Sequence, residues 1–171
     1  FEGSKHIHTE TVLTGSKSEC NRALIISALS NGLVGVENMS EAADTVTLKN
    51  ILESVSGDIS GQQTVDVGPA GTAMRFLTAY LSTLPGTFML TGTERMKQRP
   101  IGILAEALKT VGANILYTEK DGFPPLQISG PLSQKVSVVK IKGDISSQYI
   151  SALLMIAPVL PGGLTLQIEG E

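Results

Sequence analysis

The sequence predicts an α/β (α+β) domain made of repeated βαβαββ units, with buried helices on the inside and sheets on the outside. Three stretches, which begin near Gly15, Gly71 and Ser146, share one pattern: a small polar start, an almost wholly apolar helix, a glycine turn and a strand. Apolar residues surround each helix instead of forming one stripe, as a helix buried on all sides requires. The buried helices run to about residues 30, 84 and 160, and the strands after them span 33–38, 87–91 and 164–168.

Two further helices should each bury one apolar face. Residues 44–55 begin with Asp44 in the N-cap position, and residues 100–111 begin with Pro100 at the first helical position. Each is followed by a glycine that signals a C-cap, Gly57 and Gly112 respectively. Alternating apolar and polar residues predict strands at 114–118, 126–129 and 136–141, with a hairpin turn at Asp121-Gly122.

These elements divide the chain into a terminal or hinge segment, residues 1–12, and most of one domain, residues 13–171. Within the domain the repeated units span about 13–64, 65–130 and 131–171. The first unit looks shortened, and the third ends before any second helix. Because the chain starts at Phe1 without a methionine or a signal-peptide pattern, we interpret the start as truncated.

Composition excludes several classes of protein. With 171 residues, 4% aromatic residues, no tryptophan and a net charge of −3, the chain lacks the features of a nucleic-acid or anionic-membrane binder. No apolar run is long enough for a membrane span. The one cysteine, Cys20, excludes an internal disulfide framework and favours a buried thiol over a nucleophile, which suits a reducing cytoplasm. His6 and His8 could share a metal, but no third ligand is near, so we expect neither metal nor cofactor.

The arginines indicate where chemistry takes place. Arg22, Arg75, Arg95 and Arg99 all lie within or beside the starts of predicted helices. Unpaired N–H groups at a helix N-terminus attract anions, and nearby cations strengthen that attraction. If the units bring these helix starts to one edge, they form a composite site for phosphates and carboxylates. The alternative is that the arginines form surface ion pairs.

Several motifs in order resemble those of the 5-enolpyruvylshikimate-3-phosphate synthase family. They are Gly15-Ser16-Lys17-Ser18 with Asn21-Arg22-Ala23, Ala70-Gly71-Thr72-Ala73-Met74-Arg75, Leu90–Gly102, Gly122-Phe123-Pro124-Pro125-Leu126, and Ser146-Ser147-Gln148-Tyr149 with Ala152-Leu153-Leu154-Met155. The sequence departs from the family pattern at Pro69, where Asn is usual, and at Phe76, where Pro is usual. Both positions adjoin an expected ligand contact, so they bear on the response to inhibitors such as glyphosate.

The resemblance implies an enolpyruvyl transferase-like fold of two domains that close around shikimate 3-phosphate and phosphoenolpyruvate, of which this chain is most of the first. It places Lys17, Ser18, Arg22, Ser146 and Ser147 on shikimate 3-phosphate, with Lys17 also reaching phosphoenolpyruvate. Phosphoenolpyruvate would contact the backbone of Gly71 and the guanidinium of Arg99, and Gln148 would touch both ligands, with Thr72 and Arg75 as weaker candidates.

The implied reaction transfers a carboxyvinyl group to the 5-hydroxyl of shikimate 3-phosphate and releases phosphate, a step in aromatic amino-acid biosynthesis. The resemblance places the family's main proton-transfer carboxylates in the second domain, so we expect this chain alone to have no turnover and name no catalytic residue in it. Two alternatives remain open. One is an anion-binding module of the same fold without catalysis, and the other is a relative that acts on a UDP-sugar.

Overall fold

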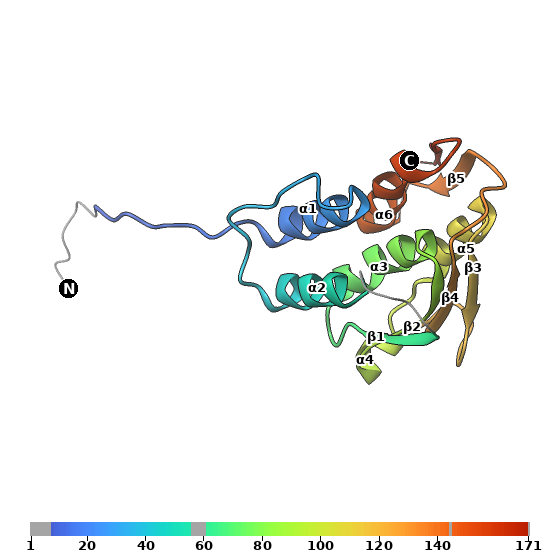
Figure 1. Cartoon of the computed structure of the whole chain (residues 1–171), viewed down its shortest axis with the longest axis horizontal. Helices are drawn as coiled ribbons and strands as arrows, with labels where there is room; N and C mark the ends of the chain where they lie inside the picture. The colour runs from blue at the N-terminus through green and yellow to red at the C-terminus, as the bar shows by residue number, and fades with distance from the viewer. Residues whose placement is uncertain (1–7, 56–60, 144, 171) are drawn as a thin grey trace.

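The computed structural model describes residues 8–55, 61–143 and 145–170, which form two sheets and a group of packed helices (Figure 1). The first sheet has the strand order β1-β2-β4-β3, and the second pairs β5 with β6. The strands are β1 (Gln62–Asp66), β2 (Gly86–Thr91), β3 (Asn114–Tyr117), β4 (Leu126–Gly130), β5 (Val138–Lys142) and β6 (Thr165–Glu169). The mixed α/β class predicted from the sequence is confirmed.

The helices lie close to their predicted positions. They are α1 (Lys17–Leu29), α2 (Ala43–Ser54), α3 (Gly71–Thr83), α4 (Glu94–Lys97), α5 (Gly102–Val111) and α6 (Ser147–Ile156), followed by a 3₁₀ turn η1 (Ala157–Val159). Two strand–helix–strand crossovers, β1-α3-β2 and β5-α6-β6, join strands that pair in parallel. β4 then runs antiparallel to both β2 and β3. Helix α3 covers the first sheet, whereas β5 of the second sheet is contacted by α5.

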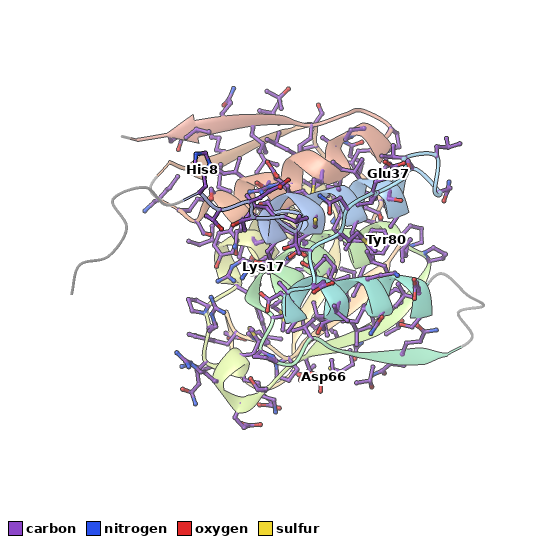
Figure 2. The ribbon with its side chains drawn as sticks, turned by 90° about the vertical axis from the view of Figure 1, so that its left-hand side faces the viewer. His8, Lys17, Glu37, Asp66 and Tyr80 are labelled. Carbon is purple, nitrogen blue, oxygen red and sulfur yellow. The ribbon has the colours of Figure 1, made fainter. Side chains whose placement is uncertain are left out.

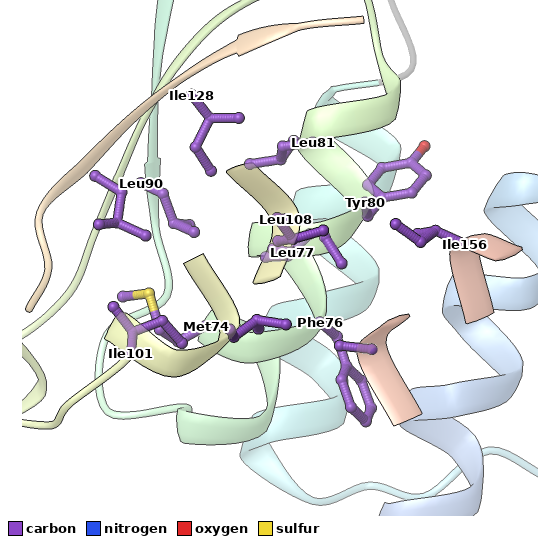
Figure 3. Close-up of a cluster of buried hydrophobic side chains, with 14 of the residues drawn as sticks. Met74, Phe76, Leu77, Tyr80, Leu81, Leu90, Ile101, Leu108, Ile128 and Ile156 are labelled. Carbon is purple, nitrogen blue, oxygen red and sulfur yellow. The ribbon is translucent and has the colours of Figure 1, made fainter. Parts of the chain in front are cut away.

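Helix α3 is the centre of the core. It packs against β2 and β4 on one side and against α1, α2 and α6 on the others. Leu77 and Leu81 point toward Leu90 and Ile128 of the first sheet, while Phe76 lies on the opposite side of the helix (Figure 3). The prediction of burial on all sides is therefore confirmed for α3.

The same prediction is wrong for α1 and α6. Ile26 on α1 and Leu154 on α6 are both exposed, and the buried residues of each helix form one face. The reason is positional, because α3 lies between the sheet and the other helices, whereas no described residue covers these outer faces. Some apolar side chains of α1 and α6 therefore remain exposed among the described residues.

The strand predicted at residues 33–38 is also wrong, since these residues form an irregular loop. Leu33 is 89% exposed, and Asn31 and Asn38 have positive φ angles of 53° and 47°. A strand needs a neighbour to satisfy its backbone N–H and C=O groups, and among the described residues no strand pairs with this segment. The first repeated unit consequently lacks its second strand in the described part of the chain.

Some predicted helix ends differ from those observed. Ala42 is the N-cap of α2 and Asp44 lies inside its first turn, where a carboxylate still favours the helix dipole. Helix α5 begins at Gly102, so Pro100 precedes the helix and is not its first residue. The backbone N–H groups of Ile101 and Gly102 both donate to the carbonyl of Gly122, and these bonds fix the chain just before the helix. Gly112 is confirmed as C-cap, whereas Gly57 lies outside the described residues.

The hairpin between β3 and β4 is confirmed, but its connection is longer than a two-residue turn at Asp121-Gly122. It spans residues 118–125, with Gly122 at a positive φ of 83°. Cys20 is buried and accepts a hydrogen bond from the backbone N–H of Ser40, as expected of a structural thiol. No described helix combines the length and the apolar character needed to cross a bilayer.

Gly112→Ala should destabilise the chain by about 2–4 kcal/mol. Gly112 has a φ of 128°, and a Cβ there would collide with the carbonyl oxygen of Ser133 and lie 2.9 Å from its carbon, both backbone atoms that cannot turn away. Gly163→Ala is the matched control, since Gly163 has a φ of 59° and open space around it. Urea unfolding measures the free energy of unfolding of both variants, and we expect Gly163→Ala to lower it by only about 1–2 kcal/mol. Equal losses would show that backbone conformation alone matters at Gly112.

Candidate anion-binding site

The starts of α1, α3 and α6 are joined through side chains. The amide nitrogen Nε2 of Gln148 on α6 donates to Oγ1 of Thr72 on α3, at 3.1 Å. The Nε of Arg22 on α1 donates to Oγ of Ser151 on α6, at 3.4 Å. These bonds link residues far apart in the sequence, so the helix starts from three separate segments lie together, as the sequence predicts.

The start of α1 carries a lysine and an arginine held by different partners. Arg22 donates through one terminal nitrogen to the carbonyl and the hydroxyl of Ser18, at 2.9 and 2.7 Å. Lys17 is exposed, and its Nζ lies 3.6 Å from the carboxylate of Asp44 in the first turn of α2. Figure 2 shows Lys17 on the left of the molecule, apart from Tyr80 on the right, which belongs to the distal half of α3. Sequence reasoning gave Asp44 a capping role and missed this ion pair.

A second group of cations surrounds the start of α3. A Cβ built on Gly71 would collide with a terminal nitrogen of Arg99, and it would lie 2.8 Å from the guanidinium carbon and 3.0 Å from a terminal nitrogen of Arg75. Arg75 is only 9% exposed and donates to the carbonyl of Gly71 at 2.8 Å, while its Nε has no partner among the described residues. Gly71 is therefore the point that both arginines approach, and only a glycine leaves room for Arg99.

The buried position of Arg75 separates it from the exposed cations. Its guanidinium lies 5.5 Å from the ring centre of Tyr149, which is itself buried. The hydroxyl of Tyr149 donates to the carbonyl of Pro100 at 2.7 Å. Sequence reasoning quoted Tyr149 as part of a motif without a role, and no local signal connects it to Pro100, 49 residues earlier.

The remaining predicted residues lie at the start of α6 or away from the site. Ser146 is the N-cap and accepts from the backbone N–H of Gln148 at 3.4 Å, and Ser147 is exposed in the first turn. Arg95 is exposed on α4, and no contact joins it to the other arginines in the described part of the chain. Three of the four arginines therefore surround the helix starts.

The two departures from the family pattern differ in their surroundings. Phe76 is buried in the core at 1% exposure, whereas Pro69 is exposed in the turn before α3. Only Pro69 is thus accessible to a ligand near Gly71.

The arrangement suits anionic groups. Three helix starts present unpaired backbone N–H groups, and Lys17, Arg22, Arg75 and Arg99 add four positive charges against the carboxylates of Asp44 and of Glu19, which is exposed in the first turn of α1. Hydroxyls of Ser18, Ser146 and Ser147 provide further polar contacts. Within the described ranges no cluster of three or more histidine, cysteine or acidic side chains could hold a metal ion.

Fold and site together define an α/β domain with a candidate anion-binding edge, and comparisons with known proteins identify its family. A solved structure titled EPSP synthase from Acinetobacter baumannii matches 86% of this chain and 37% of its own length, with a TM-score of 0.71 and 22% identity. A second structure of that title from the same organism matches with a TM-score of 0.69. These likenesses show the fold.

The family model described as EPSP synthase (3-phosphoshikimate 1-carboxyvinyltransferase) matches residues 1–171, so the chain belongs to the EPSP synthase family. A Bacteroides fragilis protein named 3-phosphoshikimate 1-carboxyvinyltransferase is 53% identical over 160 residues, which are 93% of this chain and 37% of the relative. A protein of the same name from Sulfurovum is 41% identical in an alignment that is 187 residues long with its gaps and that covers 98% of this chain and 44% of the relative. The chain thus spans well under half the length of these relatives.

Proposed function

We propose that this chain is part of a transferase that moves the carboxyvinyl group of phosphoenolpyruvate to the 5-hydroxyl of shikimate 3-phosphate and releases phosphate. The observation that carries the proposal is the joined set of helix starts, where Gln148 contacts Thr72 and the guanidinium of Arg99 lies against Gly71. The family membership and the name shared by the relatives support it. The buried single cysteine agrees with a reducing cytoplasm as the site of action.

Each substrate would use a different part of the site. Shikimate 3-phosphate would bind the side chains at the starts of α1 and α6, namely Lys17, Ser18, Arg22, Ser146 and Ser147. Phosphoenolpyruvate would contact both the backbone of Gly71 and the guanidinium of Arg99, which lie side by side, and Lys17 would also reach it. Gln148 would contact both, because it is on α6 and already bonds Thr72 on α3.

Thr72 and Arg75 would act differently from the other candidates. Thr72 accepts the bond that fixes Gln148, and Arg75 holds the carbonyl of Gly71 from inside the protein. Both would therefore hold residues of the phosphoenolpyruvate site in place without contacting the ligand themselves. An inhibitor that resembles phosphoenolpyruvate, such as glyphosate, would meet the same Gly71 and Arg99.

In the proposed reaction the 5-hydroxyl loses its proton and adds to C2 of phosphoenolpyruvate while C3 gains a proton. The tetrahedral intermediate then expels phosphate as C3 loses a proton, which restores the vinyl group. Cations steady the negative charge of both phosphates, and a carboxylate is needed to move the proton. The resemblance to the EPSP synthase family places the main proton-transfer carboxylates in the second domain, so this group would come from the remaining part of the protein. Residues 13–171 would then be most of the first of two domains, built of units at about 13–64, 65–130 and 131–171, and inactive without the second.

The test is a phosphate-release assay on the longest protein that the reading frame containing residues 1–171 encodes. We expect release that requires both substrates, and none from the 171-residue chain alone. Calorimetry with shikimate 3-phosphate on the longer protein should detect binding. Absence of both signals would overturn the proposal, and binding without release would favour the non-catalytic module. Turnover of a UDP-sugar in place of shikimate 3-phosphate would identify the other relative.

Gly71→Ala should raise the KM for phosphoenolpyruvate about three- to tenfold. The added Cβ would displace the guanidinium of Arg99, the far end of a flexible side chain, while the helix itself accepts alanine at this position. The melting temperature should therefore stay within about 2 °C of the parent. Gly35→Ala is the matched control, because Gly35 has no positive φ and no atom within 4 Å of the added Cβ. An unchanged KM in Gly71→Ala would show that Arg99 does not need its present position.

A further inference from the structure

Tyr149 belongs to the start of α6, which is assigned to shikimate 3-phosphate, while its side chain contacts Pro100 and Arg75 near the part assigned to phosphoenolpyruvate. It follows Gln148 in the first turn of α6 and is 6% exposed, so its side chain points inward instead of toward ligand. Its hydroxyl donates to the carbonyl of Pro100 at 2.7 Å, and its ring lies 5.5 Å from the guanidinium carbon of Arg75. One buried side chain thus touches the segment that carries Arg99 and the arginine that holds Gly71.

The backbone around Arg99 has few other anchors. On one side, the N–H of Arg99 donates to the carbonyl of Met96 at the end of the short helix α4, at 3.0 Å. On the other side, the N–H of Ile101 donates to the carbonyl of Gly122 at 2.9 Å. Between them Pro100 has no N–H to donate, so its carbonyl is the one backbone group through which the residue next to Arg99 can be held. That carbonyl is the acceptor of the Tyr149 hydroxyl.

We propose that Tyr149 is a positioning residue that fixes Arg99 beside Gly71 and so sets the affinity for phosphoenolpyruvate. The inference rests on the proposed function and adds a residue that touches neither substrate. Because Tyr149 belongs to the same helix start as Ser146, Ser147 and Gln148, it ties the position of Arg99 to α6. Arg75 contributes to the same assembly, since it lies over the Tyr149 ring while donating to the Gly71 carbonyl.

The test is steady-state kinetics of Tyr149→Phe in the longest protein of the reading frame. The variant keeps the ring beneath Arg75 and removes only the hydroxyl. We expect the KM for phosphoenolpyruvate to rise about three- to tenfold, the change that one lost intramolecular hydrogen bond produces. The KM for shikimate 3-phosphate should not change, since the lost bond goes to Pro100 and the variant keeps the backbone bond from the N–H of Tyr149 to the carbonyl of Ser146.

Tyr117→Phe is the matched control. It also removes one hydroxyl that donates a hydrogen bond, to the carboxylate of Glu106 at 3.0 Å, but on β3 away from the helix starts. A purely structural role for Tyr149 predicts a lower melting temperature in its variant with both KM values unchanged, which would overturn the inference.

A double-mutant cycle tests whether Tyr149 changes the KM for phosphoenolpyruvate through Arg99. If Tyr149 acts through Arg99, Tyr149→Phe should have no further effect on the KM for phosphoenolpyruvate in an Arg99→Ala background. Additive effects of the two changes would contradict the proposal. A parent protein without release that depends on both substrates would instead refute the proposed function, so the two failures are distinguishable.

Discussion

Truncation of Phe76 to alanine should lower the free energy of unfolding by about 3–5 kcal/mol, the loss expected for a fully buried aromatic ring. Phe76 is 1% exposed and lies on the side of α3 opposite the first sheet, next to the other helices (Figure 3). Because α3 is in contact with helices on that side and strands on the other, its neighbours cannot close the cavity without leaving their own partners. Both the lost apolar burial and the cavity therefore contribute.

Urea unfolding of the 171-residue chain measures this effect. Phe123→Ala makes the same chemical change at a half-buried ring in the loop between β3 and β4, and we expect a loss of about 1 kcal/mol there. Equal losses in the two variants would show that the Phe76 pocket collapses freely. A large loss at Phe76 alone would support a packing role for this departure from the family pattern, since its ring faces the core and not the Gly71 site.

Helices could be predicted from this sequence more fully than strands, and the physical reason is where their hydrogen bonds lie. The apolar run from Gly71 to Thr83 satisfies its backbone within itself and therefore forms α3 close to the predicted bounds. Residues 33–38 follow a helix and a glycine turn in the repeated pattern and include Leu33, Val34 and Val36, but a strand depends on a partner elsewhere in the chain. No such partner occurs among the described residues, and the segment stays irregular.

In the site, too, contacts within one helix could be predicted from the sequence, whereas contacts between distant segments could not. Local motifs predict that Lys17, Ser18 and Arg22 share the first turns of α1, because residues four apart lie on one helix face. They do not predict that Arg75 turns inward while Arg99 stays exposed, since both depend on how α6 packs against α3. The Lys17–Asp44 pair and the Tyr149–Pro100 bond likewise join segments that only the tertiary fold brings together.

Arg99→Ala should reduce kcat/KM for phosphoenolpyruvate about 100- to 1000-fold in the longest protein of the reading frame, as expected when a preorganised donor to a charged group is removed. The guanidinium lies against Gly71, where it can offer two parallel N–H groups to a carboxylate or phosphate. Within the described ranges no acidic side chain pairs with Arg99, so its charge is available to a ligand. The melting temperature should stay within about 2 °C, because the side chain is exposed.

Two further variants distinguish the effect of positive charge from the effect of the planar pair of N–H donors on Arg99. Arg95→Ala removes the same charge from the neighbouring helix α4, where the side chain is exposed, and it should leave kcat/KM within about twofold. Arg99→Lys keeps the charge but loses the planar pair of donors, so it should recover only part of the activity. Equal losses in Arg95→Ala and Arg99→Ala would indicate a general effect of positive charge and would remove Arg99 from the site. Full activity in Arg99→Lys would contradict two-point recognition, because a single ammonium group cannot supply the same pair of bonds.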